Sequence, residues 1–120
     1  MSISNYAENK LLDTLRGTAF SVSNAYLKLH TGDPGEDATA NAATETTRKA
    51  VSFSAASSGS LASSGTVEWT NVSTTETVTH WSLWDASTGG NNLWSGALAS
   101  SAALTAGDTF QITSLTITLD

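Results

Sequence analysis

Hydrophobic residues follow two different periods along this chain. Near the N-terminus, apolar side chains recur every four residues, at Ala7, Leu11 and Leu15, with Leu12 beside them. This spacing places them on one face of a helix. Asn5 with Glu8 three positions later resembles a capping box, and Gly17 suits the left-handed position that ends many helices. The pattern predicts a helix over residues 5–16 with a narrow apolar stripe.

After Gly17 the period changes to strict alternation, which is typical of half-buried strands. The alternating runs are Tyr26–His30, Val51–Phe53, Val67–Trp69, Val78–Asp85 and Phe110–Ile112. The run Val78–Asp85 has large residues at both parities, which predicts burial on both of its faces. Between Ile112 and Leu115 the apolar positions shift by one, so we expect a bulge or bend at residues 113–114.

Turn residues separate these runs, at Thr31–Gly35, Asp85–Asn92 and Thr105–Asp108. Residues 36–47 hold no apolar side chain larger than Ala, so we expect a long loop or arm over residues 33–47 that orders on a neighbour. The spacing of strands and turns predicts a mainly β fold, an antiparallel β-sandwich or barrel with one N-terminal α-helix. One domain, residues 1–120, would build its sandwich from residues 20–31 and 48–120.

Composition and charge exclude several classes of protein. The chain has 5 basic and 11 acidic residues and a net charge of -6, too few cations to cover a nucleic-acid backbone. It has no cysteine, so it cannot be a disulfide scaffold, and no apolar run long enough for a membrane-spanning helix. No signal peptide precedes the first element, which is compatible with assembly inside a cell. Ser, Thr and Ala dominate instead, with 18, 19 and 17 residues.

Catalytic and metal-binding motifs are weak. The two histidines, His30 and His80, lack the spacing of a metal site, and we expect each ring to bond a neighbouring loop. The acidic residues Asp33, Glu36 and Asp37 do not follow the calcium-binding EF-hand spacing. No Gly-x-Ser-x-Gly elbow or phosphate-binding loop is present. The sequence therefore predicts no enzyme, no metal and no cofactor.

The four tryptophans are expected to be core residues, because strand aromatics usually fill the core. Trp81 and Trp84 fall on opposite faces of one run, so one of them is a candidate to face a partner or to lie under a loop. Trp94 follows Asn91 and Asn92 and is expected near a loop tip. Carbohydrate binding by an exposed Trp is the alternative.

Several blocks together resemble a family of small virion proteins of tailed bacteriophages. The segment Tyr26–Gly35 resembles the family's Y-L-x-L-H-T-x-D-P-G opening, and Arg48–Phe53 its R-x-A-V-x-F strand. The segment Val78–Ala86 resembles its V-T-H-W-x-L-x-D-A strand. Residues 89–98 and 106–110 complete the pattern, so the resemblance covers about residues 5–120.

This resemblance implies a structural protein of the phage particle, of the group variously described as capsid decoration (cement) and tail-fibre-like proteins. We expect a decoration protein on the outer capsid surface, assembled in the host cytoplasm, that stabilises the shell. Its partners would be the major capsid protein and copies of itself, without nucleic acid or membrane. The expected partner contacts are Leu11, Leu15, Glu36, Asp37, Arg48, Lys49 and Trp94.

The main alternative is a tail fibre or tail adaptor, or a component that binds the host receptor; a hydrolase is remote. Fibre tips usually carry a shaft or attachment region, whereas this chain has no heptad and no internal repeat. On that ground the sequence favours capsid decoration over the tail.

Overall fold

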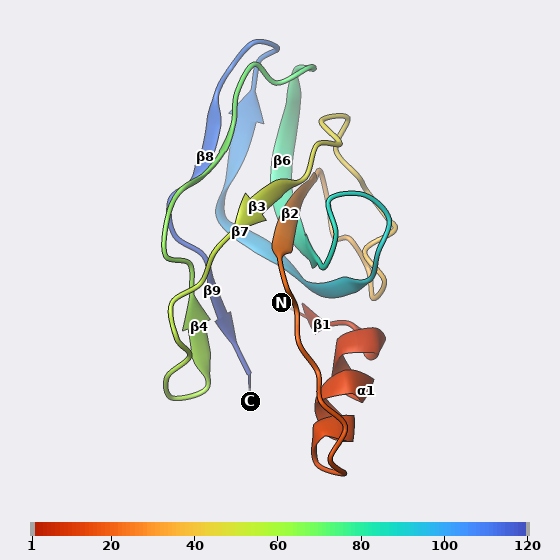
Figure 1. The fold of residues 1–120 in the computed structure, drawn as a ribbon. Helices are drawn as coiled ribbons and strands as arrows, with labels where there is room; N and C mark the ends of the chain where they lie inside the picture. Colours follow the sequence, from red (N-terminus) through yellow and green to blue (C-terminus); the bar gives the residue numbers. More distant parts are fainter. Residues whose placement is uncertain (1, 120) are drawn as a thin grey trace.

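The chain begins with strand β1 (Ser2–Ile3) and helix α1 (Asn5–Thr14) and is otherwise built from antiparallel strands (Figure 1). The structure is a computed structural model that describes residues 2–119. The further strands are β2 (Ala25–His30), β3 (Lys49–Val51), β4 (Ser60–Ala62), β5 (Val67–Trp69), β6 (Glu76–Trp84), β7 (Asn92–Leu104), β8 (Phe110–Ile112) and β9 (Thr116–Thr118).

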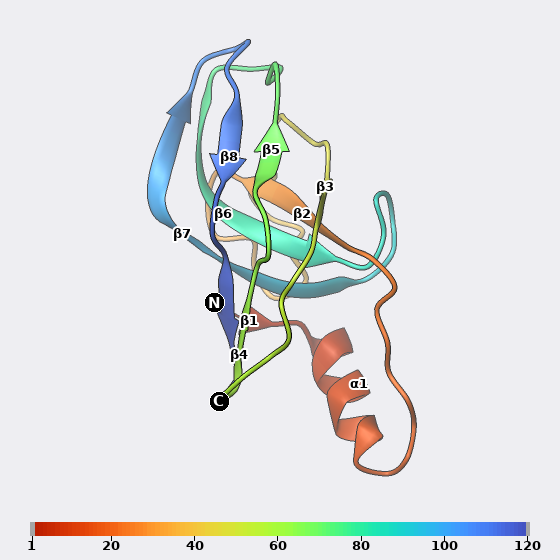
Figure 2. The same ribbon diagram turned by 60° about the vertical axis from the view of Figure 1, so that its left-hand side comes forward.

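Five strands form one sheet in the order β1-β7-β6-β2-β3, and the pairs β4–β9 and β5–β8 form two-stranded ribbons. In Figure 2, β5 and β8 lie in front of the large sheet, over the face formed by β6 and β7. This arrangement confirms the predicted mainly β antiparallel fold with one N-terminal helix. Within residues 2–119 the strands do not close into a barrel, so the barrel alternative is not adopted.

The core lies between the large sheet and the ribbons, and the predicted alternation explains its composition. Leu27 and Leu29 of β2 are fully buried. Val67 and Trp69 of β5 join Leu27 and Leu29 in the core from the side of the ribbon. Glu68, between Val67 and Trp69, is exposed, as the alternation predicts. Burying these apolar side chains supplies the main driving force for folding.

Strand β6 is buried on both faces, as predicted. Trp81 and Leu83 point into the core, whereas Ser82 is fully buried on the opposite face. Val78 joins the same core although its parity differs from that of Trp81. A register shift between Val78 and His80 accounts for this change of parity, because a bulge moves the following residues to the other face.

The predicted bend near the C-terminus is also confirmed. Strand β8 ends at Ile112 and pairs with β5, whereas β9 begins at Thr116 and pairs with β4. Leu115, between the two strands, is buried with Ile112 and Ile117. The shift of apolar parity therefore marks the point where the chain passes from one ribbon to the other.

Strand β7 is longer than predicted. The apolar pairs Leu93–Trp94 and Ala97–Leu98 indicate one short strand, but the strand runs from Asn92 to Leu104. Residues 99–103 in its second half are all Ser or Ala, which carry no alternating apolar signal. That half is held as a strand by pairing with the start of β6, where Glu76 lies opposite Leu104.

Helix α1 begins at Asn5, as predicted, but its N-cap lies one residue earlier than expected. The helix ends at Thr14, two residues before the predicted end. The N-cap is Ser4, not Asn5: the Ser4 hydroxyl accepts a hydrogen bond from the Ala7 amide at 3.1 Å. Glu8 lies in the first turn, where its charge complements the helix dipole, but it does not complete a capping box. Gly17 has φ +91, which confirms its predicted left-handed conformation after the helix.

Candidate interaction surfaces

Helix α1 is attached to the sheet mainly through its N-terminal turn. The Ser4 hydroxyl donates to the Asn92 carbonyl at 2.6 Å, and the Ser4 amide donates to the Leu93 carbonyl at 3.0 Å. Ala7 is the one residue of the helix that is buried. Tyr6 makes an edge-to-face contact with Phe20, at a centroid separation of 6.2 Å, which joins the helix to the segment that follows it.

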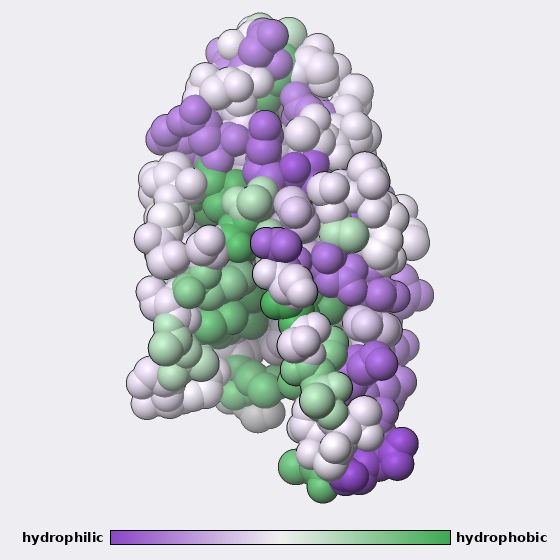
Figure 3. All heavy atoms as spheres, in the orientation of Figure 1, coloured by the Kyte–Doolittle hydropathy of each residue, from purple (hydrophilic) through white to green (hydrophobic). Residues whose placement is uncertain are grey.

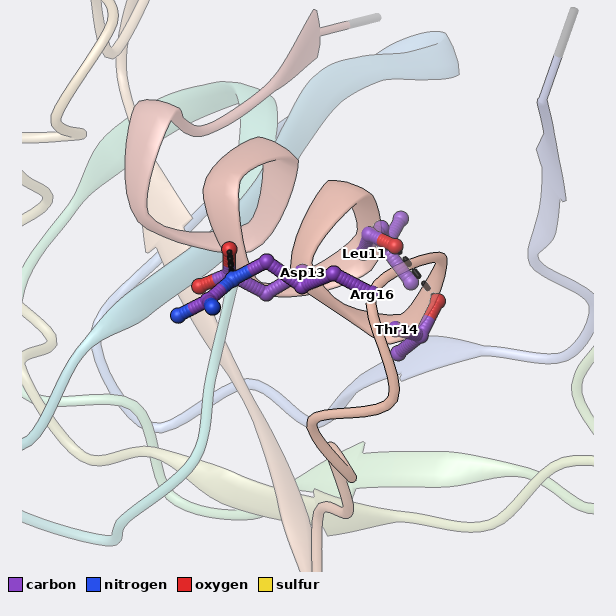
Figure 4. A network of polar contacts seen from close by, with 4 residues as sticks. All are labelled: Leu11, Asp13, Thr14 and Arg16. Atoms are coloured by element: carbon purple, nitrogen blue, oxygen red, sulfur yellow. Dashed lines mark hydrogen bonds and ion pairs between the residues drawn. The ribbon is translucent and has the colours of Figure 1, made fainter.

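The C-terminal half of the helix projects away from the sheet (Figure 1). Leu12 is 63% exposed and Leu15 is 85% exposed. Figure 4 shows the polar contacts at this end: Arg16 reaches back to Asp13 at 3.0 Å, and the Thr14 hydroxyl donates to the Leu11 carbonyl at 2.5 Å. These contacts close the helix end without covering its leucines.

An apolar groove separates this helix from the β4–β9 ribbon, and we define it by two hollows. One has a volume of about 470 Å³ and lies between residues 22–25, residues 51–53, Leu61, Leu83 and Leu93. The other, of about 330 Å³, is lined by Ile3, Glu8, Leu11, Leu12 and Leu119. Figure 3 shows hydrophobic residues gathered in the hollow between the two projecting parts of the molecule.

All four exposed large hydrophobic side chains of the described residues lie on the projecting parts that flank the groove. Besides Leu12 and Leu15 these are Val22, which is 38% exposed, and Leu119, which is 50% exposed. Single exposed leucines are ordinary, but a cluster beside an apolar groove is typical of a contact surface. We call this end of the molecule the apolar end.

The opposite end carries polar turns that are bonded among themselves. The Val72 amide donates to the Asp108 carbonyl at 3.0 Å, and the Gly107 amide donates back to the Val72 carbonyl at 2.8 Å. The Asp108 carboxylate accepts from the Thr105 amide at 2.9 Å. The molecule measures 48 Å along its longest axis, so the apolar end and the polar turns are well separated (Figure 1).

The predicted arm over residues 33–47 is a loop held by its own chain, which corrects the expectation that it orders on a neighbour. Ala38 and Ala43 are buried, and the Ala43 amide donates to the Leu29 carbonyl. The Glu76 carboxylate accepts from the amides of Thr44 and Glu45 at 2.9 and 3.0 Å. The small side chains of this loop therefore did not indicate a mobile arm, because alanine can pack closely against the sheet.

Glu36 and Asp37, two of the predicted partner contacts, are exposed on this loop. Within residues 2–119, neither side chain forms a hydrogen bond. The structure therefore leaves both carboxylates accessible without giving them a partner.

Arg48, another predicted contact, has a structural task in this fold. Its guanidinium donates to the carbonyls of Ala86 and Gly89 at 2.8 and 2.7 Å and lies 4.0 Å from the centre of the Trp84 ring. It thereby holds the loop between β6 and β7 against β6. Burial lowers the pKa of Arg48, partly offset by the nearby charge of Asp85.

The remaining cations of the sheet lie near Arg48. Lys49 pairs with Leu27 in the strand register and is partly buried at the edge of the sheet. The Lys28 ammonium lies 6.0 Å from the centre of the Trp84 ring. Burial, and then repulsion by Arg48, lowers the pKa of Lys28. These residues gather positive charge on β2, on β3 and at the residue that precedes β3.

Trp94 is not at a loop tip, contrary to prediction. It lies in β7 opposite Ile3 on one side and Leu83 on the other, and it is partly buried. Its indole Nε1 and the Asn92 Oδ1 are buried atoms without a hydrogen-bond partner in the described residues. Trp69 and Trp81 are buried, and Trp84 is partly covered, so none of the four offers the exposed ring that carbohydrate stacking requires.

The histidines have structural partners. His30 is fully buried and its Nδ1 lies 3.0 Å from the Ala40 carbonyl, which confirms the predicted bond to a neighbouring loop. His80 instead contacts the adjacent Thr79 hydroxyl at 2.7 Å. His30 and Ser82 lie 2.7 Å apart, but both are buried, so a substrate cannot reach them. Among residues 2–119 no cluster of three potential ligands forms a candidate metal site.

Sequence reasoning named Leu11 and Leu15 as contacts and missed three residues of the apolar end. Leu12 was treated only as a neighbour of the helical stripe, although it precedes Leu15 by three residues and shares its side of the helix. Val22 and Leu119 carry no local signal, because only the fold brings residues 22 and 119 near the same groove.

Comparison with known proteins identifies a family for this chain. No curated protein matches the chain. No helix within residues 2–119 has the length and apolar character needed to cross a membrane. One family of virion proteins does match, over residues 2–120, and it is described as podophage GP4 fiber I protein gp80. The chain therefore belongs to this family of phage fibre proteins, and it is a structural component of a podophage particle.

Proposed function

We propose that this chain is a non-enzymatic building block of the tail fibre, joined to an adjacent fibre subunit through its apolar end. The family description supports a fibre more directly than the capsid decoration that the sequence favoured. The earlier preference for the capsid rested on the missing shaft. A subunit that continues a fibre by surface contact needs no shaft of its own.

The observation that carries the proposal is the gathering of exposed apolar side chains at one end. Leu12 and Leu119 line one hollow of the groove and Val22 lines the other. Leu15 follows Leu12 by one turn of the helix and is also exposed, and the polar turns lie at the opposite end. Covering such side chains is worth about 25 cal/mol for each Å² of apolar surface removed from water. An end of this kind favours permanent attachment, whereas the polar end suits contact with solvent or a host surface.

The proposal is tested with phage particles that carry the double variant Leu12→Ser/Leu15→Ser. The matched control is Ala99→Ser/Ala103→Ser, which makes two exposed apolar residues of β7 polar without touching the groove. Quantitative mass spectrometry measures copies per particle, and gold-labelled antibody with electron microscopy locates the wild-type chain.

We expect label on the tail fibres, at least tenfold fewer copies of the groove variant, and full occupancy by the control. Label on the capsid shell would overturn the fibre assignment. Equal occupancy by both variants would remove the apolar end from the attachment.

A further inference from the structure

We propose that Arg48 and Lys28, which lie beside the Trp84 ring, form a binding site for a phosphate group. The ligand class is inorganic phosphate or a phosphomonoester, which carries about two negative charges at neutral pH. This inference goes beyond the proposed function and does not rest on it, because none of these three residues lines the apolar groove.

The guanidinium of Arg48 is held in place by the chain itself. Its Nη1 donates to the carbonyls of Ala86 and Gly89 at 2.8 and 2.7 Å, so both hydrogens of that nitrogen are used. The group also packs on the Trp84 ring, with Cζ 4.0 Å from the ring centre. Because the guanidinium is already ordered, a ligand that binds it loses less free energy to the ordering of this side chain.

The other edge of the same guanidinium is available to a ligand. Within residues 2–119, Nε and Nη2 of Arg48 form no hydrogen bond, since both of its bonds use Nη1. Nε and Nη2 donate side by side and form the fork that matches two oxygens of a phosphate. Arg48 is only partly buried, as a site for a ligand from solution requires.

Lys28 supplies a second positive charge beside this fork. Its ammonium lies 6.0 Å from the centre of the same Trp84 ring. Burial, and then repulsion by Arg48, lowers the pKa of Lys28, so the two charges lie close enough to repel each other. An anion bound between them would relieve this repulsion.

No acidic side chain of the described residues pairs with these two cations, although the chain has 11 acidic residues. The one ion pair within residues 2–119 joins Asp13 to Arg16. Burial lowers the pKa of Arg48 and the charge of Asp85 opposes that effect, but the Asp85 carboxylate accepts hydrogen bonds from Asn91. Neighbouring cations without a paired acid favour a ligand that brings negative charge.

The number of charges favours phosphate over a carboxylate. Phosphate has at least three acceptor oxygens and about two negative charges, so it can bond the Arg48 fork and face the Lys28 ammonium at the same time. A carboxylate has two acceptor oxygens and a single charge, and the fork alone would occupy both oxygens.

The first experiment titrates the isotope-labelled chain with sodium phosphate at neutral pH and constant ionic strength. NMR follows the Nε–H signals of Arg16 and Arg48, which are the two arginines of the chain. Arg16 is the internal control, because its Nε already bonds Asp13. We expect a saturable shift at Arg48 and none at Arg16. The absence of a saturable shift at Arg48, or equal shifts of both signals, overturns the site.

The same titration of Lys28→Gln tests the second charge. We expect about tenfold weaker binding, because a charge-assisted contact is lost. Lys28→Arg retains the charge and should keep most of the affinity. The matched control is Lys10→Gln, since the Lys10 ammonium also lies beside an aromatic ring, 5.6 Å from the centre of Tyr6. If Lys10→Gln weakens binding as much as Lys28→Gln, net charge explains the effect and the proposal is wrong.

A final series compares ligands on the wild-type chain. Methyl phosphate should bind as tightly as inorganic phosphate, whereas dimethyl phosphate and acetate, each with a single charge, should bind about tenfold more weakly. Acetate bound as tightly as phosphate would overturn the assignment to phosphate. Glucose phosphate separates two sources of the ligand: binding as tight as that of inorganic phosphate supports a phosphate carried by a saccharide, and much weaker binding supports free phosphate.

Discussion

His30 accepts a hydrogen bond from the Ser82 hydroxyl, with 2.7 Å between Nε2 and Oγ. The direction follows from its neighbours: Nδ1 faces the Ala40 carbonyl, which can only accept, so Nδ1 carries the proton. The Ser82 oxygen in turn accepts from the Trp84 indole at 2.7 Å. This chain of bonds joins β6 to β2 and to the loop that follows β2, and it requires a neutral imidazole.

The stability of the fold should therefore depend on pH through His30. Burial is the main cause that lowers the pKa of His30 below its usual 6.5, opposed by the bond to Ala40. As pH falls below about 6.5 the unfolded chain takes up this proton before the folded chain does, so the free energy of unfolding decreases. Urea unfolding between pH 7.5 and 5.5 measures the decrease.

In the same series His30→Gln should be less stable at every pH but should lose most of this dependence, whereas His80→Gln should keep it. An unchanged pH dependence in His30→Gln would show that another group is responsible.

Gly96→Ala should destabilise the chain by about 1–3 kcal/mol, the usual cost of overpacking a core. A Cβ at residue 96 would lie 2.7 Å from Cζ2 of the buried Trp81 ring. Gly65→Ala is the control, since nothing lies within 4 Å of its added carbon. Thermal unfolding should show a lower midpoint for the first variant only, and equal midpoints would contradict the close approach.

Ser4→Ala should cost about 1–2 kcal/mol, because it removes a helix cap and a buried hydrogen bond to the Asn92 carbonyl together. Ser2→Ala, at an exposed position, serves as the control. Chemical unfolding measures the difference. A loss equal to that of the control would mean that α1 is held without its cap.

Arg48→Gln should loosen the loop between β6 and β7, since the guanidinium bonds the Ala86 and Gly89 carbonyls. Hydrogen exchange should rise in residues 86–91 and stay unchanged in the β2–β6 pairing. Lys49→Gln, one position further on, should leave both regions as they are. Faster exchange throughout the sheet would instead mean that Arg48 supports the whole fold.

Local sequence patterns were sufficient to locate the strands wherever one face of a strand is buried. The alternation around Leu27 and Leu29 placed β2 correctly, and the parity shift before Leu115 located the passage from β8 to β9. They also suggested the wrong helix cap, because Ser4 is selected by its contact with Asn92, a residue 88 positions away. The resemblance of the strand blocks identified a phage structural protein. The preference for the capsid over the fibre, which rested on the missing shaft, is not what the family supports.

By itself the sequence determined the mainly β architecture and its helix, because burial imposes a period of two on strands and of 3.6 on helices. It also excluded disulfides, through the absence of cysteine. Only the tertiary structure decided which apolar residues stay exposed, since Leu15 and Leu29 are the same residue type with opposite surroundings. Likewise, the fold turned Arg48 inward to its own loop and brought Val22 and Leu119 to one groove, because such contacts depend on segments that are distant in the chain.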